Sequence, residues 1–138
     1  MAYPLTILPD PMVALRQYLM SCTPLTSLTS ATKIVTELPV NPDYSTPYIV
    51  LTSVGGGGIW PAIDEPALQV DSVGGDKATC SKVARTVRAC VWAIANDRVP
   101  EGLLCSGSEE TSPAWLPDTI SNPPVSRFTA RYRFLLKR

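Results

Sequence analysis

The stretch TSVGGGGIW places four consecutive glycines between an apolar run and Trp60. Glycine-rich loops bind phosphate when their backbone amides lead into a helix N-terminus, usually with a lysine and a serine or threonine behind the glycines. The residues that follow here, IWPAIDEP, supply neither a helix pattern nor a lysine, and Asp64 and Glu65 would repel a phosphate. We therefore interpret the glycines as the tip of a hairpin, with Trp60 as an apolar anchor beyond it.

Paired carboxylates are a second possible source of chemistry, because they can act as acid and base or hold a divalent ion. Asp64 with Glu65 and Asp71 with Asp76 are the candidate pairs. The sequence has no histidine, which is the usual general base and the commonest metal ligand. It also lacks an SxxK pattern that would activate a serine. We predict a non-enzymatic protein without catalytic residues, metal or cofactor, and keep a small hydrolytic or ligand-binding domain that uses the acidic loop as the alternative.

Charge and cysteine content give weaker indications. Lysine plus arginine equals aspartate plus glutamate at twelve each, but residues 34–76 hold six acids and no base, and residues 119–138 hold five bases and no acid. Two regions of opposite charge can be solvated faces, or can pair between copies of the chain. The four cysteines have no CxxC spacing and predict reduced thiols packed as small hydrophobes in a cytoplasmic protein. We expect no signal peptide and no membrane span.

Two segments have the pattern of amphipathic helices. In the first, Asp10 is a good N-cap and Pro11 suits the first helical position, and an apolar stripe follows at three- and four-residue steps. The second follows VGGD, where Asp76 caps a helix from about residue 77 to 96. Its predicted buried stripe is Cys80, Val83, Ala84, Val87, Val91 and Ile94, and Lys82, Arg85 and Arg88 lie on the opposite, solvated side.

Strand patterns occupy residues 33–38, 47–54 and 68–73 and the C-terminal segment VSRFTARYRFLLKR. In that last segment Phe128, Tyr132 and Phe134 alternate with basic residues, which predicts a half-buried strand with one basic face. Residues 97–124 contain five prolines and no periodicity, so we predict a long loop there. The predicted fold is an α/β (α+β) domain over residues 1–138, in the order α-β-β-β-α-β, with two helices on one face of a four-stranded mixed sheet.

Three stretches taken together, TPYIVLTSVGG, LQVDSVGGDKATCSKVARTVRACV and the terminal alternating strand, resemble the tail terminator (tail completion) proteins of long-tailed bacteriophages. The resemblance implies a virion protein that is assembled in the bacterial host cytoplasm and forms a hexameric ring at the head-proximal end of the tail tube. Such a ring ends tube polymerisation and joins the tail to the head, with the tube protein and a head-side neck connector as partners. DNA passes through the ring without sequence-specific binding, and no cofactor or membrane is involved.

A ring needs interfaces in which one patch meets a different patch on the next copy. The glycine hairpin and the acidic and basic regions supply candidate patches, and the other head-tail connectors or minor capsid proteins are the alternative within the same class. The predicted interface residues are Gly55, Gly56, Gly57, Gly58, Trp60, Asp64, Glu65, Arg127, Arg131 and Arg133.

Overall fold

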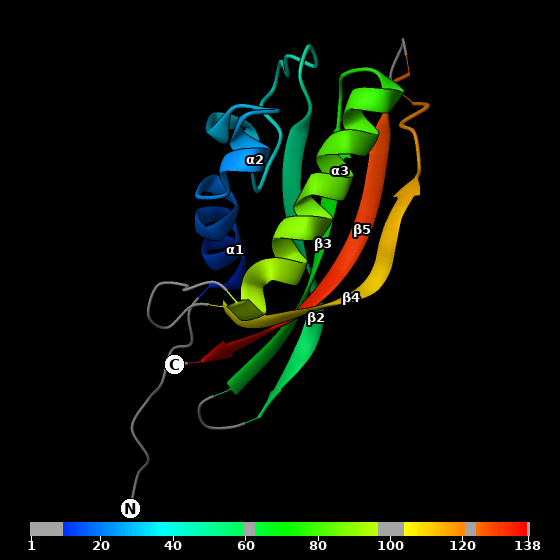
Figure 1. Ribbon diagram of the computed structural model, residues 1–138. Helices are drawn as coiled ribbons and strands as arrows, with labels where there is room; N and C mark the ends of the chain where they lie inside the picture. The colour runs from blue at the N-terminus through cyan, green and yellow to red at the C-terminus, as the bar shows by residue number, and fades with distance from the viewer. Residues whose placement is uncertain (1–9, 60–62, 97–103, 121–123, 138) are drawn as a thin grey trace, which may run out of the picture.

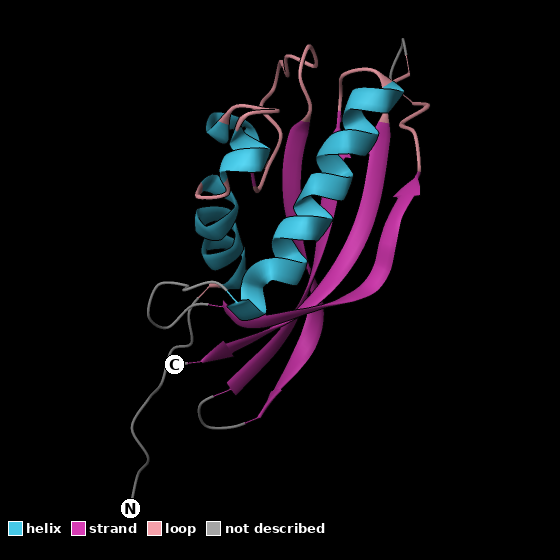
Figure 2. Ribbon diagram, in the orientation of Figure 1, coloured by secondary structure: helices cyan, strands magenta, loops and turns pink. Residues whose placement is uncertain are grey.

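The computed structural model describes residues 10–59, 63–96, 104–120 and 124–137. In these ranges three helices lie on one face of a twisted sheet, and none of the described helices or strands covers the opposite face (Figures 1 and 2). We call the uncovered side the open face. No helix in these ranges is long and apolar enough to span a membrane.

The two predicted helices form where local signals predict them, but the prediction of two helices is wrong because a third, α2, forms in the Ser/Thr-rich segment after the first. Asp10 caps α1 (Pro11–Met20) by accepting a hydrogen bond from the backbone N–H of Met12 at 2.9 Å. A short α2 (Thr23–Thr26) and a 3-10 turn over Ala31–Lys33 follow. Asp76 caps α3 (Lys77–Trp92) through the N–H of Thr79 at 2.7 Å, and a second 3-10 turn over Ala93–Asn96 continues it. Both predicted N-caps are confirmed.

The sheet has five strands rather than the four predicted. They are β1 (Ile34–Val35), β2 (Tyr48–Ile59), β3 (Ile63–Val73), β4 (Leu104–Trp115) and β5 (Arg127–Lys137), in the spatial order β1-β2-β3-β5-β4. Only β1 and β2 pair in parallel, and the other neighbours are antiparallel. The broad α+β class is confirmed, and the strand count is wrong because β4 forms inside the segment predicted as a loop at 97–124.

The loop prediction failed because β4 is a strand of poor strand formers. Its sequence, LCSGSEETSPAW, contains glycine, proline and adjacent glutamates, all depleted in strands. Pairing with β5 compensates, with register partners from Leu104↔Leu136 to Trp115↔Phe128 and three register shifts between them. The strand exists because β5 lies beside it, which is a tertiary effect that local propensity does not contain.

The core lies between the helices and the covered face of the sheet. The predicted stripe of α3 is buried at every position, and it packs with Leu15 and Leu19 of α1 over the sheet. From β5, Ala130, Tyr132 and Phe134 are 5%, 0% and 1% exposed, which confirms the predicted alternation of that strand. The residues between them point to the open face.

Candidate assembly surface

The glycine run lies inside β2 and not at a hairpin tip. Gly57 and Gly58 pair with Glu65 and Asp64 of β3, and the register shifts between Ser53 and Gly56. Gly55 and Gly56 have φ angles of 103° and 114°, a left-handed conformation that favours glycine at a β-bulge. A Cβ added at Gly56 would collide with the backbone oxygen of Glu65. The glycines thus allow a bulge and a close approach of β2 to β3.

The predicted hairpin residues fall at one end of the sheet. Asp64 and Glu65 belong to β3, directly across from the glycines, so the acidic loop of the sequence prediction is a strand. Glu65 is half-buried. Trp60 lies outside the described residues. The structure therefore brings the glycines and the two acids together as one paired ribbon.

The predicted arginines form a row along β5. Arg131 and Arg133 are exposed on the open face, where their strand neighbours on β3 are Gln69 and Ala67. Arg127 lies at the end of β5 that is remote from the glycines of β2. Its Nε donates to the backbone oxygen of Leu116 at 2.8 Å. The structure thus separates the described members of the predicted set, all except Trp60, into a glycine end and an arginine row.

Glu110, which sequence reasoning missed, pairs with Arg133. The Arg133 Nη2 lies 2.6 Å from the Glu110 Oε1, and Nε donates to the same oxygen at 3.0 Å. Arg133 thus has an acidic partner within its own chain, and both side chains remain partly exposed. Its predicted role at a subunit interface stays a prediction. Arg131 has no ion-pair partner within the described ranges.

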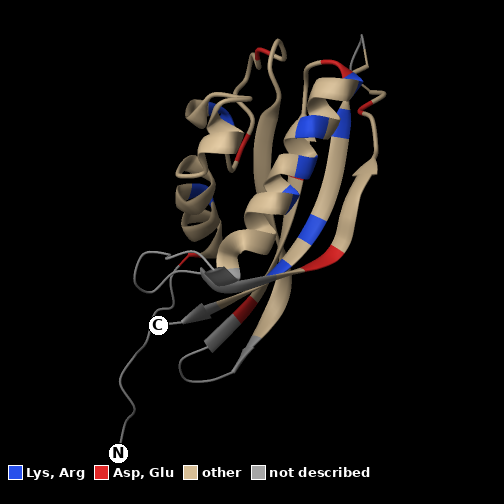
Figure 3. Cartoon of the chain, in the orientation of Figure 1, with Lys and Arg blue, Asp and Glu red and all other residues tan. Residues whose placement is uncertain are grey.

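Glu109 makes the equivalent pair on the covered side. It accepts both Nε and Nη2 of Arg88 at 2.7 and 3.0 Å, and the Arg88 guanidinium also lies 4.2 Å from the centre of the Trp92 ring. Arg88 is therefore half-buried in this pair, whereas Lys82 and Arg85 are exposed as predicted. The acids of β4 lie next to basic positions of α3 and β5 (Figure 3). Charge complementarity between neighbouring strands was the signal that could have revealed β4.

The other candidate chemical groups have structural roles. The Gln69 amide donates to both carboxylate oxygens of Asp71 at 3.2 Å. The N–H of Thr79 holds the pKa of the Asp76 carboxyl below its usual value. Burial raises the pKa of the Cys80 thiol to about 11, and this thiol donates to the Ser72 oxygen at 2.9 Å. Across the described part of the chain, no group of three or more histidine, cysteine, aspartate or glutamate side chains could hold a metal.

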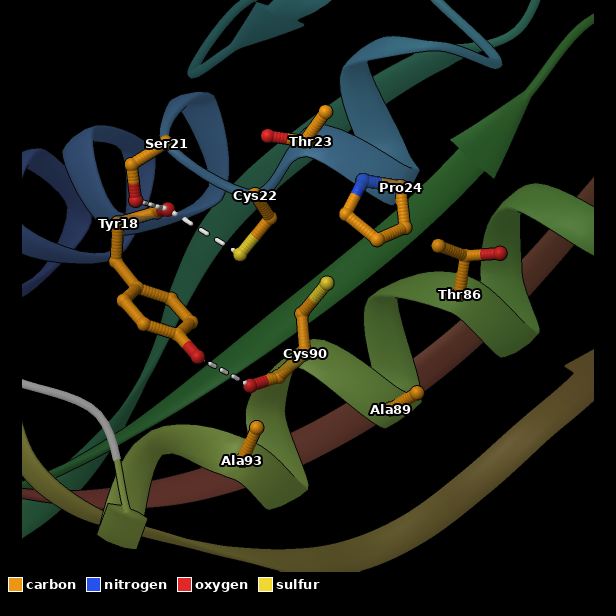
Figure 4. A pocket seen from close by; sticks show the side chains of 9 residues that line it. All are labelled: Tyr18, Ser21, Cys22, Thr23, Pro24, Thr86, Ala89, Cys90 and Ala93. Atoms are coloured by element: carbon orange, nitrogen blue, oxygen red, sulfur yellow. Dashed lines mark hydrogen bonds between the residues drawn. The ribbon is translucent and has the colours of Figure 1, made fainter.

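A cavity of about 350 Å³ separates the α1–α2 connection from α3 (Figure 4). The Tyr18 hydroxyl donates across it to the backbone oxygen of Cys90 at 2.7 Å. The Ser21 hydroxyl and the Cys22 thiol both donate to the backbone oxygen of Tyr18. The Tyr18 bond therefore joins α1 to α3, whereas the other two bonds stay within the end of α1.

No family model matches the chain, and no curated protein matches it either. Among solved structures, the fold is similar to that of a chain in the virion of a native gene transfer agent particle. The TM-score is 0.65 and the sequence identity is 15%, over 92% of this chain and 94% of that chain. At this identity the similarity concerns the fold, and it extends over nearly the whole length of both chains.

Proposed function

We propose that the protein is a structural component of a phage virion, and that within this class it is a tail terminator. It forms a ring on the head-proximal end of the tail tube. The resemblance of its sequence to tail terminator proteins implies that the ring is a hexamer. The ring ends tube polymerisation and joins the tail to a head-side connector. The observation that carries the proposal is the similarity in fold, over nearly the full length of both chains, to a chain of the gene transfer agent virion.

The distribution of side chains is consistent with an assembly protein. The open face presents arginines and other polar groups in rows across the sheet, for example Thr52, Gln69, Arg131 and Thr111 in one register line. Such a face can line a channel or meet a partner without burying an apolar surface. The ring passes DNA through its centre without reading its sequence, since contacts to phosphate alone carry no base specificity.

Deletion of the gene in the phage or particle that encodes it tests this function. We expect tail tubes of excessive and variable length that fail to join heads, together with separate filled heads, in negative-stain electron microscopy. Re-expression of the wild-type chain should restore uniform tails. Tails of normal length that remain separate from heads would instead indicate a head-side connector, and the loss of capsids altogether would indicate a capsid component.

A second experiment tests the position directly. Purified chain, added to tail-tube protein during polymerisation in vitro, should cap the tubes at one end and limit their length. Gold-labelled chain found along the sides of the tubes, or at neither end, would contradict the terminator role.

A further inference from the structure

The outer edge of β2 is mostly unpaired. Strand β1 covers only Ile49 and Val50, through the pairs Ile34↔Ile49 and Val35↔Val50. From Leu51 to Ile59, β2 pairs with β3 on its inner side, and no described strand pairs with its outer side. Unpaired N–H and C=O groups along such an edge are a template for another strand.

This free edge lacks the charges and prolines that protect many sheet edges, and its one protective feature is the β-bulge at Gly55 and Gly56. Lysine, proline and inward-pointing charges usually prevent pairing with other chains, and the segment LTSVGGGGI contains none of them. Thr52 and Ser53 are exposed, and a Cβ placed at Gly57 would meet no other atom within 4 Å. The described part of this edge is therefore exposed to solvent at Thr52, Ser53 and Gly57.

The other edge of the sheet is β4, and part of it lies opposite the free part of β2 along the register lines that cross the sheet. The register line Thr52↔Gln69, Gln69↔Arg131 and Arg131↔Thr111 joins the two edges across the sheet. A second line runs from Gly58 through Asp64 and Leu136 to Leu104. The free part of β2 is thus level with residues 104–111 of β4, and Pro113, which blocks pairing, lies beyond that part.

Strand direction favours a contact between these two edges in a ring. Each of the three steps from β2 through β3 and β5 to β4 is antiparallel, so β4 runs opposite to β2. Rotation about a ring axis preserves the direction of every strand relative to that axis. The β4 edge of one copy then meets the β2 edge of the next in an antiparallel arrangement, which is the more stable pairing.

The charges of β4 do not oppose this contact. Glu109 and Glu110 are paired with Arg88 and Arg133 of their own chain. The approaching β2 segment, residues 51–59, carries no charged side chain. No unpaired carboxylate from β4 is therefore forced against a like charge.

We infer that the free edge of β2 at residues 51–59 binds a second copy of this chain through its β4 edge at residues 104–111. The contact is heterologous and continues the sheet from one subunit to the next. It rests on the proposed function only for the closure of the subunits into a ring. Main-chain hydrogen bonds supply the contact, as in other cases of strand addition.

Disulfide trapping tests the contact. Thr52→Cys and Thr111→Cys are each introduced alone in a Cys105→Ser background, because Cys105 lies on β4 itself. Within one chain the two positions are three strand spacings apart, about 14 Å at ~4.8 Å per spacing, whereas a disulfide needs Cα atoms within ~7 Å. Any disulfide between them therefore joins two chains.

We expect covalent dimers on non-reducing gels when the two single variants are mixed and oxidised, and none when either is oxidised alone. The double variant should give a ladder that ends at the number of subunits in the ring. Ser108→Cys and Ser112→Cys, used in place of Thr111→Cys, scan the register and should cross-link less. The Cys105→Ser chain without further substitution is the matched control and should remain monomeric on the gel.

The inference is overturned if none of the three β4 positions cross-links to Thr52→Cys, or if Thr52→Cys alone dimerises as well as the mixture. Failure of the edge contact and failure of the proposed function give different results. Rings in electron microscopy without these cross-links would refute the edge contact and leave the terminator role intact. Cross-linked open filaments that never cap tail tubes would support the edge contact and refute the terminator role.

Discussion

The two faces of the sheet in this protein differ in what they can contribute. The covered face carries large apolar side chains such as Tyr132, Phe134 and Leu68, all nearly fully buried under α1 and α3. The open face carries Gln69, Arg131 and other polar side chains on the same strands. One strand, β5, supplies both sets by simple alternation. The difference indicates that the covered face stabilises the fold, whereas the open face and the sheet edges are available for assembly.

Removal of a large side chain from the covered face should have the largest effect. Phe134→Ala leaves a cavity in a core residue that is 1% exposed, and we expect the free energy of unfolding to fall by about 3–5 kcal/mol. Urea denaturation followed by circular dichroism measures it. Arg131→Ala, three residues away on the open face, is the matched control and should change stability by less than about 0.5 kcal/mol. Equal losses of unfolding free energy in Phe134→Ala and Arg131→Ala would contradict the claim that only the covered face stabilises the fold.

Charge reversal on the open face should affect assembly more than folding. Arg131 has no ion-pair partner in the part of the chain that the structure describes, so Arg131→Glu breaks no pair there. We expect stability to change by less than about 1 kcal/mol while the subunit dissociation constant rises about tenfold, equivalent to ~1.4 kcal/mol. Sedimentation equilibrium measures the dissociation constant.

The control for this variant uses the neighbouring pair. Exchange of Arg133 and Glu110, as Arg133→Glu with Glu110→Arg, keeps the ion pair and the net charge of the open face. The double variant should assemble like the wild type. An unchanged oligomer in Arg131→Glu would show that the arginine row is merely solvated.

The covered face contains one polar group whose removal should stabilise the fold. The Tyr132 hydroxyl is buried and has no hydrogen-bond partner among the described residues. Burial raises the pKa of this hydroxyl well above its usual value, and the nearby Glu109 carboxylate adds to the shift. A buried polar group without a partner costs about 1–3 kcal/mol, so Tyr132→Phe should raise the free energy of unfolding by about 1 kcal/mol. Loss of stability in this variant would show that the hydroxyl has a partner, such as an ordered water.

Sequence patterns predicted the helices and the faces of β5 because those signals are local. Asp76 and the three- and four-residue spacing behind it determine α3, and strict alternation assigns Phe134 and Arg131 to opposite faces. Local propensity did not predict β4, because the stability of β4 comes from pairing with β5, which follows it in the chain. For the same reason Glu110 was missed as the partner of Arg133. The interface role of the glycine end and of the arginine row stays a prediction.

The smallest effect that we predict concerns the N-cap that holds α3 over the covered face. Hydrogen bonding from the N–H of Thr79 lowers the pKa of Asp76 in the folded state, so the unfolded state binds the proton more readily as the pH falls. The stability that the ionised cap contributes is therefore complete above about pH 4 and is lost as the pH falls through the lowered pKa of the folded state. Asp76→Asn keeps an N-cap of similar strength without a titrating group. Below about pH 4 the unfolding free energy of the wild type should fall relative to that of Asp76→Asn. Urea denaturation at each pH measures the difference. A constant difference from pH 3 to pH 7 would mean that the charge of Asp76 does not contribute, and that the cap acts only through the geometry of its oxygen.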